Sequence, residues 1–348
     1  MGGDFGPSIA IDAARLALAE GLGPLTLIGT DEVIESLPTS LREQVNVMSA
    51  PEVIGMGESP SRAARAKKKS SMHIGMRAVR EGEASAFITA GNSGAALAVG
   101  VLILKRIKGC DRPAIASVLP TASGEIVLLD LGANVEVRPA QYAQFAVLGA
   151  AYAKATLGVE RPRIGLLSNG TELSKGTETL RNAHRLLSVT DLNYIGFVEG
   201  NSLPLGRCDV VVTDGFVGNV ALKLTEGVIE GLGIRLKSHL KKSWRGKLIG
   251  ALLRPVLRDF ASEVDWRRFG GAPLLGLNGT VVVSHGRSDE RALCEAIRRA
   301  RQLSMNNLQI QLTEALESTP YAGTVSSTAE LSLLHSTTGP RNDQTNED

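Results

Sequence analysis

Short apolar runs recur along the sequence, and each is followed by a glycine-bearing turn and then by apolar residues at helical spacing. Four of these runs are predicted to be buried strands, at 84–89, 127–131, 164–168 and 209–213. The helix after the second strand is expected to begin at Pro139, because proline is favoured in the first helical turn. The helix after the third strand is expected to run from about Lys175 to Leu187. This alternation is typical of stacked βα units.

The turns after the four predicted strands are where a ligand is expected. Strands joined through helices pair in parallel, so their carboxyl ends should meet at one edge of the sheet, where open α/β folds bind ligands. The four turns lie at 91–94, 132–134, 169–170 and 214–219. No fixed-period repeat and no break in composition divides residues 1–317, which predicts a single α/β domain. Ser, Thr, Gly, Asn and Asp dominate 318–348, which is expected to be a disordered tail.

Residues 228–268 depart from this alternation and predict a basic, amphipathic helical excursion. The first helix has one apolar face, formed by Ile229, Leu232, Leu236 and Leu240. A second apolar stripe, which Pro255 should kink or split, comprises Leu248, Ile249, Leu252, Leu253, Val256, Leu257 and Phe260. The segment from Arg235 to Arg258 contains eight Lys or Arg and no Asp or Glu.

Two interpretations of this excursion remain open. Helical apolar stripes usually pack in a core, so it could be a hairpin on the domain or against a second subunit, with solvated charges. Alternatively, a basic amphipathic helix gains both apolar burial and electrostatic attraction at anionic lipid headgroups or at an acidic protein partner.

Composition excludes several classes of protein. Among 348 residues, 38 Lys and Arg against 36 Asp and Glu give a net charge of +2, which argues against a nucleic-acid binder. Cys110, Cys208 and Cys294 are too far apart in sequence for a zinc motif or a disulfide framework and suit a reducing cytosol. No apolar stretch is long enough to span a membrane, and the first residues lack a signal-peptide pattern. A cytoplasmic location is therefore predicted.

The four glycine turns predict an anion site, because a helix N-terminus presents free N–H groups and the positive end of the helix dipole. No P-loop and no clean GxGxxG motif occurs, so the specific signals of nucleotide binding are missing. An amide stands beside glycine or alanine in each turn, at Asn92, Asn134, Asn169 and Asn219. Each alone is explained as well by turn chemistry or helix capping, but four together favour an oxyanion-binding or carbonyl-binding cleft.

Three lysine sites can add positive charge to that cleft: Lys175, Lys223 and the run at 67–69. The run could equally be a solvated helix face. Asp4 and Asp214 sit beside glycines, where an aspartate is as often a cap as a catalyst. No Ser-His-Asp set, nucleophile elbow or Cys-His pair is present, and no carboxylate or histidine cluster indicates a metal. Neither a covalent acyl-enzyme nor a cofactor is therefore predicted.

Taken together, the motifs closely resemble the bacterial phosphate acyltransferase family of phospholipid synthesis, the PlsX family, over residues 1 to about 313. They keep the family order and approximate spacing. The motifs are Met1-Gly2-Gly3-Asp4-Phe5-Gly6-Pro7, Ser59-Pro60, Lys67-Lys68, Ser70-Ser71-Met72, Ala90-Gly91-Asn92-Ser93-Gly94-Ala95, Leu129-Asp130-Leu131-Gly132-Ala133-Asn134, Lys175-Gly176, Val198-Glu199-Gly200, Thr213-Asp214-Gly215-Phe216-Val217-Gly218-Asn219-Val220-Ala221-Leu222-Lys223 and Gly270-Gly271-Ala272-Pro273-Leu274-Leu275-Gly276.

The resemblance implies a homodimeric three-layer α/β/α sandwich with a mainly parallel sheet, related to phosphotransacetylases and isopropylmalate dehydrogenases. It implies transfer of a long-chain fatty acyl group from acyl carrier protein to inorganic phosphate, without a cofactor. The acyl phosphate would pass to a membrane glycerol-3-phosphate acyltransferase. We therefore expect a cytoplasmic enzyme peripherally associated with the inner face of the cell membrane, where the surface is anionic. Rival readings are a phosphotransacetylase using short acyl-CoA, a metal-dependent dehydrogenase of the related fold, and a non-catalytic membrane-binding scaffold.

Phosphate is itself a competent nucleophile, so the predicted residues hold it and stabilise the tetrahedral oxyanion. Lys175 is expected nearest the phosphate or oxyanion, with Asp214 orienting a lysine or accepting a proton and with amides donating hydrogen bonds. The predicted catalytic residues are Lys175, Asn92, Asp214 and Asn219. The predicted phosphate- or substrate-binding residues are Asp4, Lys67, Lys68, Gly91, Ser93, Gly94, Asn134, Ser168, Gly218 and Lys223. The predicted membrane or carrier-protein surface comprises Lys241, Lys242, Leu248, Leu252, Leu253 and Leu257.

Two features depart from the family pattern. The family places a short strand before Met-Gly-Gly-Asp, whereas this sequence starts at Met1, so either the start is assigned late or a sheet strand is missing. The third turn reads Ser168-Asn169-Gly170, where the family has Asn, an apolar residue and Gly. Ser168 therefore aligns better with the family amide than Asn169 does.

Overall fold

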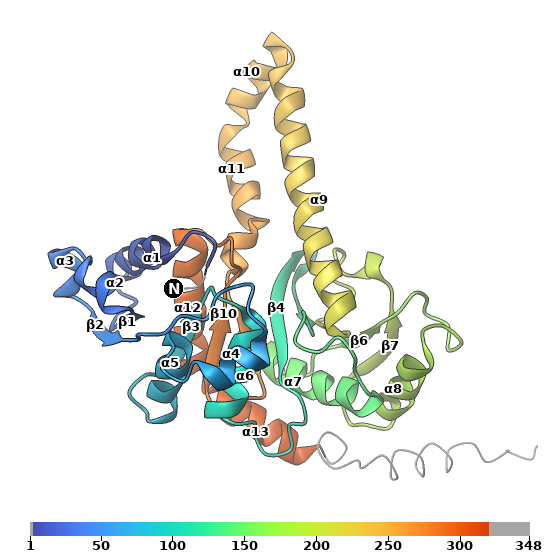
Figure 1. The fold of residues 1–348 in the computed structure, drawn as a ribbon. Coiled ribbons are helices and arrows are strands. Elements are labelled where there is room, and N and C mark those ends of the chain that lie inside the picture. The colour runs from blue at the N-terminus through green and yellow to red at the C-terminus, as the bar shows by residue number, and fades with distance from the viewer. Residues whose placement is uncertain (1–2, 320–348) are drawn as a thin grey trace, which may run out of the picture.

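The computed structural model describes residues 3–319 of the chain (Figure 1). Within them, an eight-stranded sheet has the order β3-β10-β9-β4-β5-β8-β6-β7. Its strands are β3 (Ala86–Thr89), β4 (Ala114–Thr121), β5 (Gly124–Leu129), β6 (Ile164–Leu167), β7 (Tyr194–Val198), β8 (Val210–Val212), β9 (Ala272–Leu275) and β10 (Thr280–Val283). Four of its seven neighbouring pairs are parallel, and the pairs β10–β9, β9–β4 and β4–β5 are antiparallel. The tail predicted at 318–348 lies, from residue 320 on, outside the described residues.

Helices cover both faces of the sheet, which confirms the predicted three-layer α/β/α architecture. One face carries α1 (Pro7–Ala19), α7 (Pro139–Leu157), α8 (Glu178–Ser188), α12 (Glu290–Met305) and α13 (Leu308–Ser318). The other face carries α4 (Pro60–Ala66), α5 (Ser71–Arg80), α6 (Ser93–Ile103) and the first turns of α9 (Gly215–Lys241). Two short 3₁₀ helices, η1 (Gly200–Ser202) and η2 (Trp266–Phe269), are also present among the described residues.

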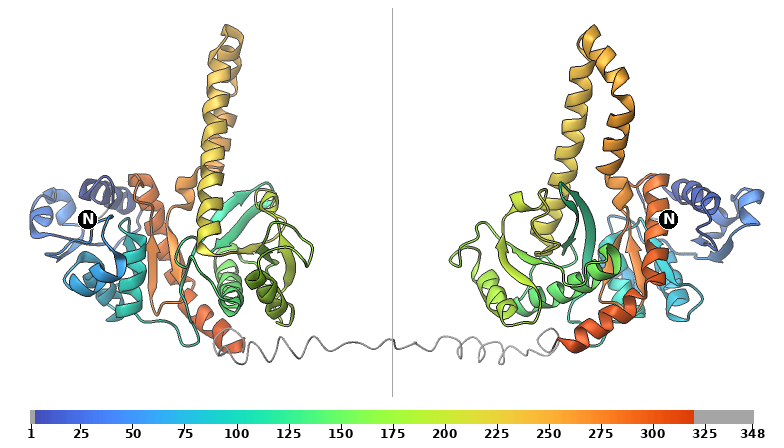
Figure 2. Two further views of the ribbon diagram at one scale, coloured as in Figure 1. Left: turned by 45° about the vertical axis from the view of Figure 1, so that its right-hand side comes forward. Right: turned by 180° about the vertical axis from the view of Figure 1, so that it is seen from behind.

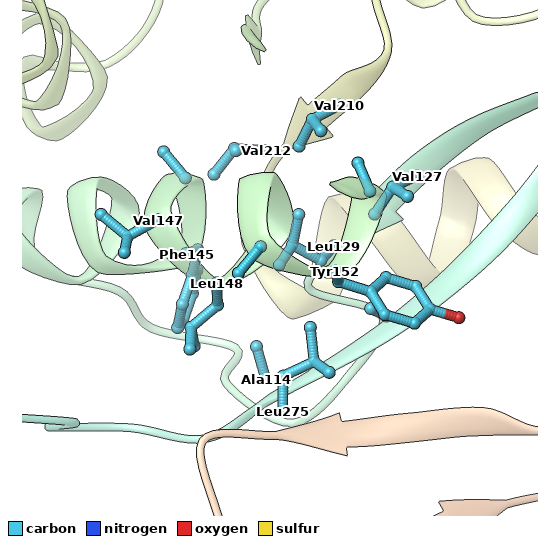
Figure 3. Packing of buried hydrophobic residues seen from close by; sticks show 14 of the residues in the cluster. Ala114, Val127, Leu129, Phe145, Val147, Leu148, Tyr152, Val210, Val212 and Leu275 are labelled. Atoms are coloured by element: carbon cyan, nitrogen blue, oxygen red, sulfur yellow. The ribbon is translucent and has the colours of Figure 1, made fainter. Parts of the chain in front are cut away.

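Two apolar cores follow from the alternation of side chains along the central strands. On β5, Val127 and Leu129 face the core under α7, whereas Ile126 and Leu128 face the core under α6. Figure 3 shows the first of these cores, where Phe145 and other side chains of α7 pack on the sheet. The helix α7 begins at Pro139, as the sequence predicts. This double burial explains why the strand segments read as continuous apolar runs.

The prediction that all four glycine turns follow parallel strands and meet at one edge is wrong. The three antiparallel pairings between β10 and β5 reverse the direction of the sheet, so β3 runs opposite to β5, β6 and β8. The turn after β3 therefore leaves from the opposite edge. The sequence could not show this reversal, because β9 lies far along the chain from β4.

A small N-terminal unit stands beside the large sheet. Its parallel strands β1 (Thr26–Gly29) and β2 (Asn46–Ser49) form a separate two-stranded sheet. The short helices α2 (Asp31–Glu35) and α3 (Thr39–Arg42) lie between these strands in the sequence. A cavity of about 720 Å³ lies between β1 and the edge strand β3, and Gly3 is at its wall. Within residues 3–319, no strand pairs with the side of β1 away from β2 or with the side of β3 away from β10.

A long helical hairpin projects from the sheet (Figures 1 and 2). Its first arm is the 27-residue helix α9, about 40 Å long at the usual rise per residue. The chain turns back through α10 (Trp244–Leu252) and descends through α11 (Arg254–Glu263). Pro255 lies in the first turn of α11, so the predicted break at this proline is confirmed.

Candidate functional site

A cleft of about 1400 Å³ lies where the hairpin joins the sheet. Gly91 and Ser93 from the start of α6, Gly132 from the turn after β5, and Asn219 and Lys223 from α9 contribute to its wall. Three of the four predicted turns therefore reach one cleft despite the reversed direction of β3. The third turn, at 169–170, is not part of this wall.

Asn92 forms the N-cap of α6 and is fully engaged. Its Oδ1 accepts from the backbone N–H of Ala95 at 3.0 Å, and its Nδ2 donates to the carbonyls of Met56 and Glu58 at 3.0 and 3.1 Å. The N–H groups of Ser93 and Gly94 lie in the first helical turn, where no intrahelical acceptor is available. The helix dipole adds to their attraction for an anion, so this end of the cleft suits phosphate or a carbonyl oxygen.

The loop that Asn92 holds is held a second time by Lys67. The Lys67 ammonium donates to the carbonyl of Val53 at 2.7 Å and to Oε1 of Glu58 at 2.6 Å. The hydrogen bond from Lys67 to Glu58, together with one from the N–H of Gly55, lowers the pKa of the Glu58 carboxyl. Lys67 follows the last turn of α4 and is committed to the loop, whereas Lys68 beside it is exposed.

The turn after β5 is organised by a buried carboxylate, Asp130. Its oxygens accept from the backbone N–H groups of Ile115, Ala133 and Asn134 and from the side chain of Asn134. Burial raises the pKa of Asp130, and these donors oppose that rise. The Asn134 amide also donates to the carbonyl of Pro113 at 2.9 Å, so both of its hydrogens are used inside the protein. Asn134 is not part of the cleft wall, but its hydrogen bonds hold the turn that contributes Gly132 to that wall.

The fourth predicted turn is not a turn but the first turn of α9. Asp214 is the N-cap: its Oδ1 accepts from the N–H of Val217 at 2.8 Å, and its Oδ2 accepts from the Tyr142 hydroxyl at 3.2 Å. Burial, together with Asp214, raises the pKa of Tyr142. Gly215 and Gly218 lie against the backbone of the turn at 130–134 so closely that a Cβ on either would collide with it. Glycine therefore lets the helix N-terminus reach the cleft.

Asn219 and Lys223 lie one turn apart on α9 and face the cleft. Within residues 3–319, no hydrogen bond engages the side-chain amide of Asn219, and no ion pair engages Lys223. Of the three predicted amides Asn92, Asn134 and Asn219, only the last is free in the described part of the chain. Asn219 and Lys223 are thus the predicted residues best placed to meet an anionic substrate.

Lys175 does not open a helix, contrary to the sequence-based prediction. It lies in the loop before α8, which begins at Glu178 with Thr177 as N-cap. Asn169 links this loop to the preceding strand by accepting from the N–H of Gly176 at 2.9 Å, and Ser168 lies beside it. The aliphatic part of Lys175 lies over Gly170. None of these residues contributes to the wall of the cleft described above.

At the far side of the cleft, the N-terminal motif meets the segment after β10. The N–H of Asp4 donates to the carbonyl of Gly286 at 2.9 Å, and the Asp4 carboxylate lies beside Gly286. The neighbouring His285 lines the cleft, and burial, with a contribution from Arg287, lowers the pKa of its imidazole. Arg287 itself pairs with Glu226 of α9 at 2.9 Å.

Sequence reasoning missed several residues of the cleft wall. Met56, Ser117, Thr225, Glu226 and His285 all contribute to it. Thr225 and Glu226 could have been found, because the face defined by Ile229 continues towards the N-terminus of α9 at a helical spacing. Ser117 and Met56 carried no signal, since they reach the cleft only through the antiparallel centre of the sheet and a loop.

The cleft offers no metal site that residues 3–319 could form, as no group of three His, Cys, Asp or Glu side chains comes together there. All three cysteines are buried, free thiols. Burial raises the pKa of Cys110 to about 12 and that of Cys208 to about 11. Among the described helices, none is both long and apolar enough to cross a bilayer.

The predicted surface residues of the hairpin fall into two groups. Lys241 and Leu257 line the cleft between the arms. Lys242, Leu248, Leu252 and Leu253 are exposed near the tip, where Trp244 also projects with 71% of its surface accessible. The hairpin thus presents apolar side chains both inward and outward, and the inward set was only partly anticipated.

The fold is similar to those of a solved phosphotransacylase and a solved phosphotransacetylase. A branched-chain phosphotransacylase from Enterococcus faecalis superimposes with a TM-score of 0.54 at 15% identity, covering 87% of this chain and 96% of that protein. A phosphotransacetylase from Streptococcus pyogenes gives 0.53 at 18% identity, covering 89% and 91%. At these identities the similarity establishes the fold alone, and it agrees with the predicted fold.

Sequence similarity to curated proteins is much higher. The chain is 44% identical over 319 residues to a protein of Pelobacter propionicus named phosphate acyltransferase, covering 91% of this chain and 92% of that protein. It is 46% identical over 305 residues to a phosphate acyltransferase of Syntrophotalea carbinolica, covering 87% and 88%. A family model described as fatty acid synthesis protein matches residues 1–311. The predicted resemblance is therefore confirmed, and the chain belongs to this fatty acid synthesis protein family.

Proposed function

We propose that this protein transfers a fatty acyl group from acyl carrier protein to inorganic phosphate and releases acyl phosphate for phospholipid synthesis. The observation that carries the proposal is one cleft in which a helix N-terminus, the Asn219 amide and the Lys223 ammonium lie at the base of a mainly apolar groove; neither side chain has a hydrogen-bond or ion-pair partner among residues 3–319. Relatives named phosphate acyltransferase, 44–46% identical over about nine-tenths of the chain, support the reaction.

The chemistry needs no covalent enzyme intermediate. An oxygen of hydrogen phosphate attacks the thioester carbon, the C–O bond forms and a tetrahedral oxyanion develops. The C–S bond then breaks, and the proton of the phosphate ends on the departing thiolate, so acyl phosphate and the free carrier thiol result. Holding phosphate beside the thioester and stabilising the oxyanion are the protein's two tasks, and both are electrostatic and positional.

Each task has a candidate group in the cleft. The N–H groups of Ser93 and Gly94 and the α6 dipole would hold phosphate. The Asn219 amide and the Lys223 ammonium, one turn apart on α9, would meet the oxyanion or a second phosphate oxygen. Asn92, Asp130 and Asn134 would act as positioning residues, because their polar groups are committed to holding the loops of the cleft.

The experiment is phosphate-dependent loss of the thioester of palmitoyl-acyl carrier protein, followed together with the appearance of free carrier thiol. We expect turnover only when phosphate is present. Thioester loss at the same rate without phosphate would indicate hydrolysis, and no loss in either case would favour a non-catalytic scaffold. Acetyl-CoA is the matched short substrate, and preferential turnover of it would favour the phosphotransacetylase alternative.

We further propose that the hairpin tip binds an anionic membrane, so that acyl phosphate is released close to a membrane glycerol-3-phosphate acyltransferase. Trp244, Leu248 and Leu252 are exposed at the tip, and Lys242 and Arg245 lie among them. This combination suits the boundary between headgroups and acyl chains. Acyl carrier proteins are acidic as a class, so docking of the donor at the same cations is the alternative that the Discussion tests.

The outer face of α9 supports a homodimer as the working form of the enzyme. Val220, Leu224 and Val228 recur along this face at helical spacing, and each has at least half of its surface exposed. Exposed apolar stripes of this kind usually mark a protein interface. We expect Leu224→Glu to halve the molar mass in solution measured by light scattering. A wild-type molar mass equal to one chain would rule the homodimer out.

A further inference from the structure

The cleft extends beyond the residues that the reaction itself needs. From Asn219 it continues between α9 and α11, two arms that lie side by side in Figure 1. The wall of this extension, called here the interarm groove, is mainly apolar. Leu222, Ile229 and Leu236 from α9 line it together with Leu257 and Phe260 from α11 and Val264, which directly follows α11. A groove this long and apolar is not required to hold phosphate.

The two ends of the interarm groove differ in chemistry. At the sheet, Ser93, Asn219 and Lys223 provide polar groups for a reacting carbonyl and phosphate. Towards the tip the groove is closed, because Gly246 packs directly against the backbone of Leu240. Lys237, Arg254 and Arg258 line the groove between these ends, beside its apolar wall. An occupant should therefore have a polar head at the sheet and an apolar body that extends towards the tip.

The length of the groove matches such an occupant. Leu222 and Leu236 are fourteen residues apart on α9, which corresponds to about 20 Å along the helix axis. One long acyl chain spans about half of a ~30 Å hydrocarbon layer, or roughly 15 Å. A long chain whose carbonyl lies at Asn219 would reach Ile229, and a chain of half that length would end short of it.

On the basis of the proposed function, we propose that the interarm groove is the binding site for the fatty acyl chain of the thioester. The carbonyl lies at Asn219, beside the phosphate at Ser93, and the methylene chain lies between α9 and α11 with its end beside Ile229. Each methylene buried in this way contributes roughly fourfold to affinity at most. The groove thus makes the enzyme select long acyl groups.

A glycine in the groove allows a direct test. Gly233 is part of the groove wall, and a Cβ there would meet no atom within 4 Å, so Gly233→Phe adds bulk without displacing neighbours. Because helical side chains tilt towards the N-terminus, the new ring would cover the space beside Ile229. Ser262 of α11 is exposed and is not part of the wall, so Ser262→Phe adds the same ring outside the groove and is the matched control. Neither change threatens its helix, since phenylalanine is a better helix former than glycine and about as good as serine.

The measurement is kcat/KM for palmitoyl and octanoyl thioesters of acyl carrier protein. For Gly233→Phe we expect a loss of at least about 10-fold with palmitoyl and a change within about twofold with octanoyl. Ser262→Phe should match the wild type with both, and light scattering of both variants reports any loss of a dimer. Equal losses for the two chain lengths, or no loss for either, would overturn the proposal and leave the groove to a second copy or to the carrier protein.

A binding measurement separates this proposal from the proposed function. The fluorescence of cis-parinaric acid rises when the fatty acid enters an apolar site, with no turnover required. We expect binding to wild type and Ser262→Phe, and binding at least about 10-fold weaker to Gly233→Phe. Equal binding to all three proteins would overturn the proposal that the interarm groove binds the acyl chain. Absence of phosphate-dependent turnover in the wild type would overturn the proposed acyl transfer. The comparison of fatty-acid binding would still test whether the interarm groove holds an acyl chain.

Discussion

Gly218 of α9 lies directly against the carbonyl oxygen of Asp130, with no room for a Cβ between them. The carbonyl belongs to the turn whose geometry the Asp130 carboxylate holds through four hydrogen bonds. Neither partner can move easily, because one is in the first turn of a long helix and the other is buried under the cleft. This contact sets how closely the first turns of α9, which carry Asn219 and Lys223, approach the turn at 130–134.

Gly218→Ala should therefore destabilise the protein and impair the cleft together. The added methyl group meets backbone, which cannot rotate away, so we expect a loss of about 1–3 kcal/mol in the free energy of unfolding. Chemical denaturation measures this loss, and turnover measures the displacement of Asn219. Gly227→Ala is the control, because its surroundings are open and alanine favours the helix by up to about 1 kcal/mol. A variant at 218 as stable as wild type would contradict the contact.

Replacing Asn219 or Lys223 by alanine should reduce turnover without affecting stability. Both side chains face the cleft and, within residues 3–319, make no hydrogen bond or ion pair that the fold would lose. If either stabilises the oxyanion, its loss costs on the order of 10²-fold in kcat. Asn134→Ala is the contrasting variant: its buried amide holds the turn at 130–134, so its melting temperature should fall as well. Normal turnover in Asn219→Ala and in Lys223→Ala would place the reaction elsewhere.

Lys175 remains a sequence-based prediction for the phosphate site and needs its own measurement. Lys175→Ala should cost about 10²-fold in turnover if its charge acts in the transition state. Lys175 lies in the loop before α8 and outside the wall of the cleft, whereas Lys223 lines that wall. Lys223 is therefore the better-supported candidate for the phosphate site. Near-normal activity of Lys175→Ala at saturating phosphate, beside a strong loss for Lys223→Ala, would remove Lys175 from the catalytic residues.

Periodicity predicted the alternating strands and helices of this fold, because buried strands and amphipathic helices leave strong periodic signals, and the family resemblance implied the three layers. Of the four turns expected to converge, three contribute residues to one cleft wall, namely Gly91, Gly132 and Asn219. Sequence reasoning failed where the outcome depends on non-local pairing: the reversed direction of β3 follows from β9, which lies far along the chain from β4. It also failed where a polar side chain has two possible roles. Asn92 and Asn219 look alike in sequence, yet only the hydrogen-bond partners of Asn92 commit it to a loop.

Stability should fall as the pH is lowered through about 6.5, in part because of His73. This side chain is buried, its Nδ1 lies 2.8 Å from the Ser70 hydroxyl, and burial lowers its pKa from the ordinary value of 6.5. Below that value the unfolded chain binds a proton that the folded protein does not. The free energy of unfolding therefore declines with falling pH, by at most about 1.4 kcal/mol per pH unit for one group.

His73→Gln should make this decline shallower. Denaturation curves between neutral and mildly acidic pH measure the slope for the variant and the wild type. His184, whose pKa is also lowered by burial, should account for part of the slope that remains. An identical slope in His73→Gln and the wild type would show that His73 does not carry this pH dependence.

The cavity between β1 and β3 predicts that an added strand can join the two sheets. Both strands present a free edge to it within the described residues, and Gly3 lies at its wall, so a segment fused ahead of Met1 can reach it. Backbone pairing with two edges and burial of alternate apolar side chains should stabilise the fold. We expect an extended segment of alternating apolar residues to raise the melting temperature by several degrees. A Gly-Ser segment of equal length, which should not, is the control; equal melting temperatures would show that the cavity accepts no strand.

The hairpin tip separates membrane binding from carrier docking, because different residues serve the two. Replacing Leu252 and Leu253 by Glu removes apolar area from the tip while leaving all its cations in place. If the tip enters a membrane, this double variant should lose sedimentation with vesicles of phosphatidylglycerol and phosphatidylcholine but keep turnover in solution. If the tip docks the carrier, Lys242→Glu with Arg245→Glu should instead raise KM for palmitoyl-acyl carrier protein and leave kcat unchanged, since the opposite charges at the interface mainly govern encounter.

The apolar side chains favour the membrane. Leu252 has 73% of its surface exposed and Trp244 71%, far more apolar area than an electrostatic dock for an acidic protein requires. Cations at the rim then act by attraction to anionic headgroups, so wild-type sedimentation should weaken as salt is raised, and vesicles of phosphatidylcholine alone should retain little protein. Wild-type behaviour of both double variants, in sedimentation and in kinetics, would argue against both roles and leave the tip as an interface between two copies of the chain. Light scattering of the same variants would then show a lower molar mass than that of the wild type.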